Sequence, residues 1–141
     1  DIGKIVIPDA ILHKTGPLTE EERDVIEQHP VVGHELLSPM RTMRKTLPVV
    51  YSHHEKLDGS GYPDGISGST IPLPVRIVTV ADVFDALTTD RAYREAMRIE
   101  TAYEVLEGGV RKGWWDGEVV EELRGAISQS GIIGGDSAQA R

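Results

Sequence analysis

Two adjacent histidines open a run that ends in a loop rich in glycine and proline, His53-His-Glu-Lys-Leu-Asp-Gly-Ser-Gly-Tyr-Pro63. Neutral imidazoles beside carboxylates are ligands for borderline to hard divalent metals such as zinc, manganese or iron. The glycines and the proline at the end of the run cannot continue a helix and require a sharp turn. The pattern is compatible with a metal site and equally with a solvated helix end that leads into a loop.

The spacing of the two histidines limits how they can be used. Consecutive residues of a helix point about 100° apart. We therefore do not expect His53 and His54 to face one metal squarely. They suit two neighbouring metals, or one metal and one substrate.

A second candidate ligand is Asp82, which lies in a strongly helical segment that begins near Pro74. A carboxylate beside an apolar helix face is costly to bury unless it is paired or bound to a metal. The alternative is a partly exposed helix carboxylate. The apolar face predicted for this helix consists of Ile77, Val78, Ala81, Phe84 and Leu87.

The remaining histidines carry weaker signals when each is taken alone. His29 immediately precedes Pro30 at a junction between two predicted helices, where a histidine satisfied at a helix C-terminus is the favoured interpretation. His13 and His34 have no carboxylate-rich surroundings, so we interpret both as structural.

Composition excludes several classes of protein. The 141 residues suit one domain with a real core, and 39% of them are apolar. A formal net charge of −8 argues against a surface for polymeric nucleic acid, although local cations and metal ions would still accept a small anionic ligand. There is no cysteine, no long apolar run and no signal-like start, so we expect a cytoplasmic chain that neither enters nor spans a membrane.

The periodicity and the helix start signals predict an all-α fold. A single turn is expected from Pro8 to Leu12, and Thr19-Glu-Glu-Glu22 has the form of a capping box. Further helices are predicted over 19–29, 30–37, from Pro48 to about 53, from Pro74 onward, over 99–110 and over 116–127, the last opened by Asp116 as N-cap. We expect a globular domain over 1–128 and a flexible C-terminal tail over 129–141.

Taken together, these segments closely resemble the HD-GYP domain, a branch of the HD superfamily of metal-dependent phosphohydrolases. The resemblance is carried by Asp1-Ile-Gly-Lys4, the His29-Pro30 junction with Gly33, the His53–Pro63 run, and Ala81-Asp-Val-Phe-Asp-Ala-Leu-Thr88 followed by Asp90-Arg-Ala-Tyr-Arg94. It implies an HD-domain-like helical bundle and hydrolysis of the bacterial second messenger cyclic di-GMP, to the linear dinucleotide or on to GMP.

The resemblance also implies a role for each matching residue. Asp1 corresponds to the Asp of the HD pair, and the other ligands of a centre of two or three divalent metals, usually iron or manganese, would be His29, His53, His54 and Asp82. Lys4 corresponds to a lysine near the scissile phosphate. Substrate contacts are implied for Gly61, Tyr62, Pro63, Arg91 and Arg94. A metal pair lowers the pKa of a bound water and clamps the attacking and leaving oxygens of an in-line displacement, while lysine and arginine neutralise phosphate charge.

The sequence departs from the family pattern at its start. The His of the HD pair would precede Asp1, and the upstream helices that supply further ligands in the family are absent from the sequence. We therefore expect a fragment of a longer chain, with N-terminal helices lacking and with an incomplete metal site.

Three functions stay open at this point. The first is a metal-dependent cyclic di-GMP phosphodiesterase, which the intact His53, His54, Asp82 and Lys4 favour. The second is a non-catalytic signalling module that contacts a diguanylate cyclase domain through its loop, as the family can. The third is an HD phosphohydrolase that acts on another nucleotide.

Overall fold

The computed structural model describes residues 1–90 and 95–129, and this part of the chain is helical with no β-strand. The all-α prediction is therefore confirmed for the described residues. Arg91, Arg94 and most of the predicted tail lie outside them. The α-helices are α1 (Asp9–Leu12), α2 (Glu20–Glu27), α3 (His29–Leu37), α4 (Leu47–Ser52), α5 (Leu73–Thr88), α6 (Ile99–Arg111) and α7 (Gly117–Gln129). Three 3₁₀ helices join them, η1 (Ile2–Val6), η2 (Arg41–Met43) and η3 (Gly68–Thr70).

Local signals in the sequence set where the helices begin. Thr19 forms the predicted capping box: its hydroxyl accepts from the Glu22 N–H at 3.2 Å, and the Glu22 carboxylate accepts from the Thr19 N–H at 2.8 Å. Prolines occupy the first turn of α3, α4 and α5, where their missing N–H costs nothing. Asp116 precedes α7 and accepts from the Glu118 N–H at 3.1 Å, as an N-cap does.

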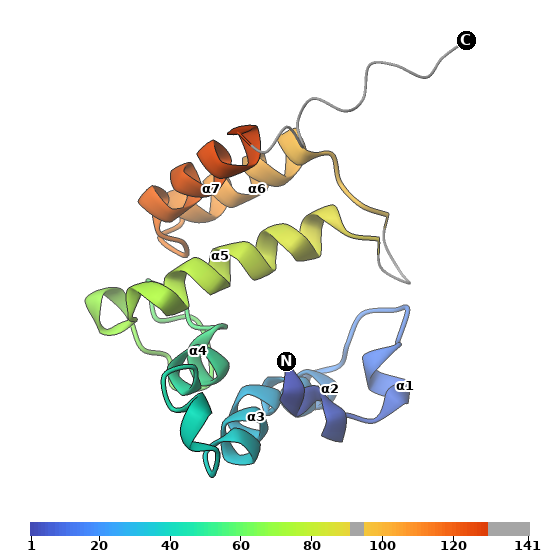
Figure 1. Ribbon diagram of the computed structural model, residues 1–141. Coiled ribbons are helices and arrows are strands. Elements are labelled where there is room, and N and C mark those ends of the chain that lie inside the picture. The colour runs from blue at the N-terminus through green and yellow to red at the C-terminus, as the bar shows by residue number, and fades with distance from the viewer. Residues whose placement is uncertain (91–94, 130–141) are drawn as a thin grey trace.

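Helix α5 is the central element. It packs against α6 and α7 on one side and against α4 on the other, while α4 packs on α3 and α3 packs on η1 (Figure 1). The core between α5, α6 and α7 is built on Val80, Tyr103, Leu106 and Val120. The chain therefore places the N-terminal segment, α3 and the end of α4 together, on the side of α5 away from α6 and α7.

The buried face of α5 differs from the predicted one. Val75, Thr79, Val80 and Leu87 are buried, whereas Ile77 and Val78 are 48% and 38% exposed. Ala81 is exposed as well. The prediction assumed one apolar stripe, but α5 contacts helices on two sides, so its buried residues are distributed around more of its circumference.

No helix in the described ranges is long and apolar enough to cross a membrane. Helix α7 ends at Gln129, one residue into the segment predicted as a tail.

Candidate metal centre

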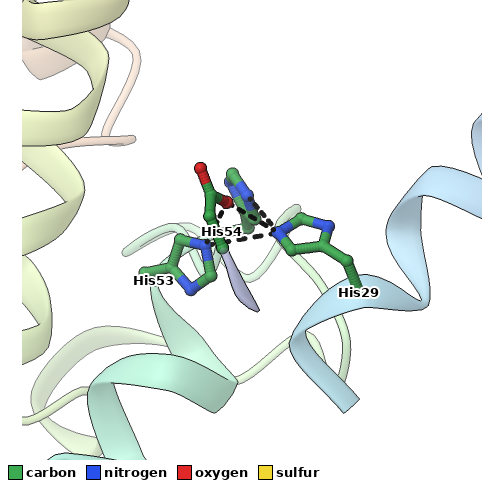
Figure 2. Close-up of side chains that lie close together, drawn as sticks. His29, His53 and His54 are labelled. Atoms are coloured by element: carbon green, nitrogen blue, oxygen red, sulfur yellow. Dashed lines mark hydrogen bonds and ion pairs between the residues drawn. The ribbon is translucent and has the colours of Figure 1, made fainter. Parts of the chain in front are cut away.

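Three imidazoles and one carboxylate converge from three separate segments of the chain. Asp1 precedes η1, His29 begins α3, and His53 and His54 directly follow α4. One ligand atom from each of the four lies within 4.8 Å of the others, and we call these residues the His/Asp cluster. Figure 2 shows the rings of His29, His53 and His54 turned toward one another. The Nε2 atom of His29 lies 3.4 Å from that of His53 and 3.2 Å from that of His54.

Backbone carbonyls fix which nitrogen of two rings carries the proton. The His29 Nδ1 lies 2.7 Å from the Ile26 carbonyl oxygen, and the His53 Nδ1 lies 3.0 Å from that of Val50. A carbonyl only accepts, so both Nδ1 atoms must donate, and in the neutral rings both Nε2 atoms carry lone pairs. Two lone pairs that face each other at 3.4 Å attract a shared cation rather than one another. The donor set therefore fits a divalent metal.

Burial keeps the imidazoles neutral, which is the form that binds metal. His29 and His53 are buried, and His54 is half-buried. Burial lowers the pKa of His29 to about 4 and that of His54 to about 3. Burial also lowers the pKa of His53, and the nearby charge of Asp82 opposes that shift.

Close backbone packing places Asp1 and Lys4 at the cluster. A Cβ atom at Gly3 would lie 1.9 Å from the His29 carbonyl oxygen and 2.6 Å from the Gly33 nitrogen, so only glycine permits this approach of η1 to α3. The Asp1 Oδ1 consequently lies 3.3 Å from the His29 Nε2. The Asp1 Oδ2 lies 2.8 Å from the Lys4 ammonium, which adds a positive charge at the edge of the cluster.

The end of α4 explains how the two adjacent histidines both reach the cluster. The helix ends at Ser52, His53 is its C-cap, and His54 lies in the turn that follows. The separation of 100° per residue applies inside a helix and no longer applies here. Both rings therefore join one cluster around His29.

Asp82 has a different place from the histidines. It is half-buried on α5, and its carboxylate is not among the four groups that lie within 4.8 Å of one another. Its charge nevertheless acts on His53 and on Tyr62. The structure thus brings Asp1, His29, His53 and His54 together directly, and Asp82 on the central helix is near enough for its charge to act on His53.

The loop over residues 58–65, here called the GYP loop, folds back onto the histidine pair. A Cβ atom at Gly61 would lie 2.5 Å from both the His54 carbonyl oxygen and the Glu55 Cα, so this glycine allows the loop to lie directly on the chain after α4. The Tyr62 ring stacks on His54, with centroids 4.7 Å apart and planes 23° apart. Tyr62 is half-buried, and burial raises the pKa of its phenol, which stays protonated. The Tyr62–Pro63 peptide bond is cis.

Two buried side chains at the site were not assigned a role from the sequence. The Thr79 hydroxyl on α5 lies 2.9 Å from the His53 carbonyl oxygen and ties the end of α4 to the central helix. Glu55 is 2% exposed, and its Oε1 accepts from the Asp64 N–H at 2.8 Å. The sequence signal for Thr79 was a threonine within an apolar helix. The signal for Glu55 was a glutamate that directly follows two histidines.

The other two histidines lie apart from the cluster. His13 is exposed, and the ring of His34 packs edge-on against Tyr51, with centroids 5.3 Å apart.

Comparison with known proteins agrees with the geometry. The HD domain family profile matches residues 1–119, and the chain belongs to this family. Within it, the HD-GYP resemblance of the sequence is confirmed, and one relative is 51% identical over 108 residues. That relative is the cyclic di-GMP phosphodiesterase response regulator RpfG of Xanthomonas campestris, and the match covers 75% of this chain and 29% of RpfG.

Other relatives agree, and so does a solved structure. The 3'3'-cGAMP-specific phosphodiesterase 1 of Vibrio cholerae is 40% identical over 123 residues, which cover 87% of this chain and 28% of that protein. The cyclic di-GMP phosphodiesterase of Thermotoga maritima is 42% identical over 109 residues, 76% of this chain and 30% of that one. The structure of Bd1817, an HDG"Y"P protein from Bdellovibrio bacteriovorus, superimposes with a TM-score of 0.71 at 18% identity, over 91% of this chain and 40% of that one, which shows a shared fold. The chain spans less than a third of the length of these curated relatives.

Proposed function

We propose that this chain is the metal-binding part of a phosphodiesterase that hydrolyses cyclic dinucleotides, with cyclic di-GMP as its substrate. The observation that carries the proposal is the pair of facing Nε2 lone pairs on His29 and His53, with His54 and Asp1 beside them. Relatives at 40–51% identity are named as phosphodiesterases of cyclic di-GMP or of 3'3'-cGAMP, which supports the substrate class. The hydrolysis product would be the linear dinucleotide or GMP.

In this proposal Asp1, His29, His53, His54 and Asp82 hold two or three divalent ions, with iron or manganese expected. The ions supply Lewis-acid activation of the phosphodiester and of the attacking water. The imidazoles remain neutral at physiological pH and present Nε2, because backbone carbonyls hold the Nδ1 protons of His29 and His53.

The surrounding residues would bind and orient the substrate. The Lys4 ammonium, 2.8 Å from Asp1, offsets the negative charge of a phosphate at the cluster. The protonated phenol of Tyr62 can donate a hydrogen bond to a phosphate oxygen, while its ring excludes water from one side of His54. Gly61 and Pro63 shape the loop, and Arg91 and Arg94, outside the described residues, are proposed as further phosphate contacts.

The outer face of the GYP loop is proposed to contact a diguanylate cyclase domain. Three of its residues, Asp58, Ser60 and Asp64, are exposed and accessible to a protein partner. This contact would be compatible with catalysis, and we place both in the cytoplasm.

The experiment is a comparison of histidine variants of the full chain, purified without chelator and loaded with manganese or iron. His54→Ala should lose most of its metal by elemental analysis and lower the hydrolysis of cyclic di-GMP by about 100-fold or more, because removal of a ligand or its support weakens metal binding strongly. His13→Ala is the matched control and should retain both. Tyr62→Ala should retain metal and lose turnover.

A substrate panel of cyclic di-GMP, 3'3'-cGAMP and nucleoside triphosphates separates this proposal from a phosphohydrolase for another nucleotide. Equal metal content in the His54 and His13 variants would refute the metal centre. Turnover of triphosphates alone would refute the substrate class.

A further inference from the structure

Glu55 is a buried, charged-type side chain of the histidine run whose role the proposed function leaves unexplained. It directly follows His54, yet it is not part of the His/Asp cluster. Its carboxylate is 2% exposed, which is unusual for a glutamate and requires compensation. The compensation comes from the GYP loop.

One carboxylate oxygen of Glu55 closes this loop. Its Oε1 accepts from the Asp64 N–H at 2.8 Å and from the Gly65 N–H at 3.1 Å, nine and ten residues further along the chain. At the other side of Tyr62, the Tyr62 N–H donates to the His54 carbonyl oxygen at 3.3 Å. Tyr62, which stacks on His54, therefore lies between two hydrogen-bonded anchors. One is the His54 carbonyl oxygen, and the other is the carboxylate of the next residue, Glu55.

The second carboxylate oxygen of Glu55 takes no part in these two hydrogen bonds. Glu55 Oε2 is buried, and within residues 1–90 and 95–129 it has no hydrogen-bond partner. Glu55 lines a cavity of about 10 Å³ together with Arg76, Thr79 and Trp115. A cavity of that size has room for about one water molecule, which would bridge polar groups there.

We propose that Glu55 is a positioning residue that holds Tyr62 against His54, and so sets how the GYP loop meets the substrate. The inference rests on the proposed function for its effect on turnover, and on the hydrogen-bond geometry alone for its effect on the loop. A charged acceptor for two N–H groups is a strong anchor, and misplacement of a substrate-contacting group by about 1 Å lowers rates by about 100-fold.

The test compares Glu55→Ala and Glu55→Gln in the full, metal-loaded chain, with the exposed Glu104→Ala on α6 as control. Glu55→Gln keeps an oxygen that can accept from the two N–H groups, so it should keep most of the exchange protection and turnover that Glu55→Ala loses. Amide hydrogen exchange at Asp64 and Gly65 should become about tenfold faster in Glu55→Ala, which corresponds to one net hydrogen bond. Turnover (kcat/KM) should fall about 10- to 100-fold with the metal content unchanged. If Glu55→Ala does not fold, Glu55→Asp, whose shorter side chain withdraws the acceptor, takes its place.

The outcomes separate the two proposals. Unchanged exchange at Asp64 and Gly65 would overturn the positioning role, whatever the turnover. Loss of metal in parallel with turnover would overturn it as well, because Glu55 would then support the ligands. If the parent chain hydrolyses no cyclic dinucleotide, the proposed function fails. Faster amide exchange in Glu55→Ala, together with a loss of the Tyr62 ring-current shift on His54, would still support the positioning of the loop.

Discussion

Replacement of Gly3 by alanine should remove Asp1 from the His/Asp cluster. The new Cβ would lie 1.9 Å from the His29 carbonyl oxygen and 2.8 Å from the His29 carbonyl carbon, and backbone atoms cannot rotate away. Relief to an ordinary contact of about 3.4 Å requires η1 to retreat by about 1.5 Å. The separation of Asp1 Oδ1 and His29 Nε2, now 3.3 Å, would then approach about 4.8 Å. Two ligands that are each about 2.1 Å from one metal cannot lie more than about 4.2 Å apart.

We therefore expect Gly3→Ala to weaken metal binding by about 10- to 100-fold, measured by competition with a chromogenic chelator. Overpacking should also lower the free energy of unfolding by about 1–3 kcal/mol, or roughly 3–10 °C in the melting temperature followed by circular dichroism. Gly33→Ala provides a milder step, because its Cβ would lie 3.1 Å from the nearest atom, a methyl of Val50, and its effects should be intermediate.

Gly125 on α7 is the matched control. A Cβ there meets nothing within 4 Å, so Gly125→Ala should stabilise the chain by about 0.5–1 kcal/mol and leave metal binding unchanged. If Gly3→Ala binds metal as tightly as the parent and melts at the same temperature, the close contact of η1 with α3 is not what places Asp1.

Three further predictions concern stability. In the metal-free chain, burial holds the pKa of His29 at about 4 and that of His54 at about 3, below the ordinary 6.5. Below pH 6.5 the unfolded state therefore binds more protons than the folded state, so the free energy of unfolding falls as the pH falls. The urea midpoint of unfolding should decline from pH 7.5 to pH 5.5. Equal midpoints at the two pH values would contradict the burial of the rings. Thr79→Val should lower the free energy of unfolding by about 1–3 kcal/mol, because it leaves the buried His53 carbonyl without its hydroxyl donor. Thr79→Ser, which keeps a hydroxyl, should retain most of the stability of the parent chain in the same urea titration. Thr19→Ala should cost about 1 kcal/mol through loss of the capping box with no change in metal binding, and a loss of metal would show that α2 is coupled to the site.

Much of the fold follows from local patterns in the sequence. The capping box at Thr19, the prolines of the first helical turns and the N-cap at Asp116 each act within one turn of helix, so the helices they open could be predicted one by one. The histidine pair and the following loop, taken together with Asp1–Lys4, the His29-Pro30 junction and the segment from Ala81, were also sufficient to predict the HD-GYP family and, through it, a metal site.

Tertiary packing decided what local patterns could not. The convergence of His53 and His54 depends on where α4 ends, and the buried face of α5 depends on its having helix neighbours on two sides. Asp1 reaches His29 because two glycines from distant segments allow backbones to touch, and Tyr62 reaches His54 because a buried glutamate holds the loop. Periodicity describes one helix at a time, whereas these contacts join residues more than a helical turn apart, and their geometry exists only after the helices pack.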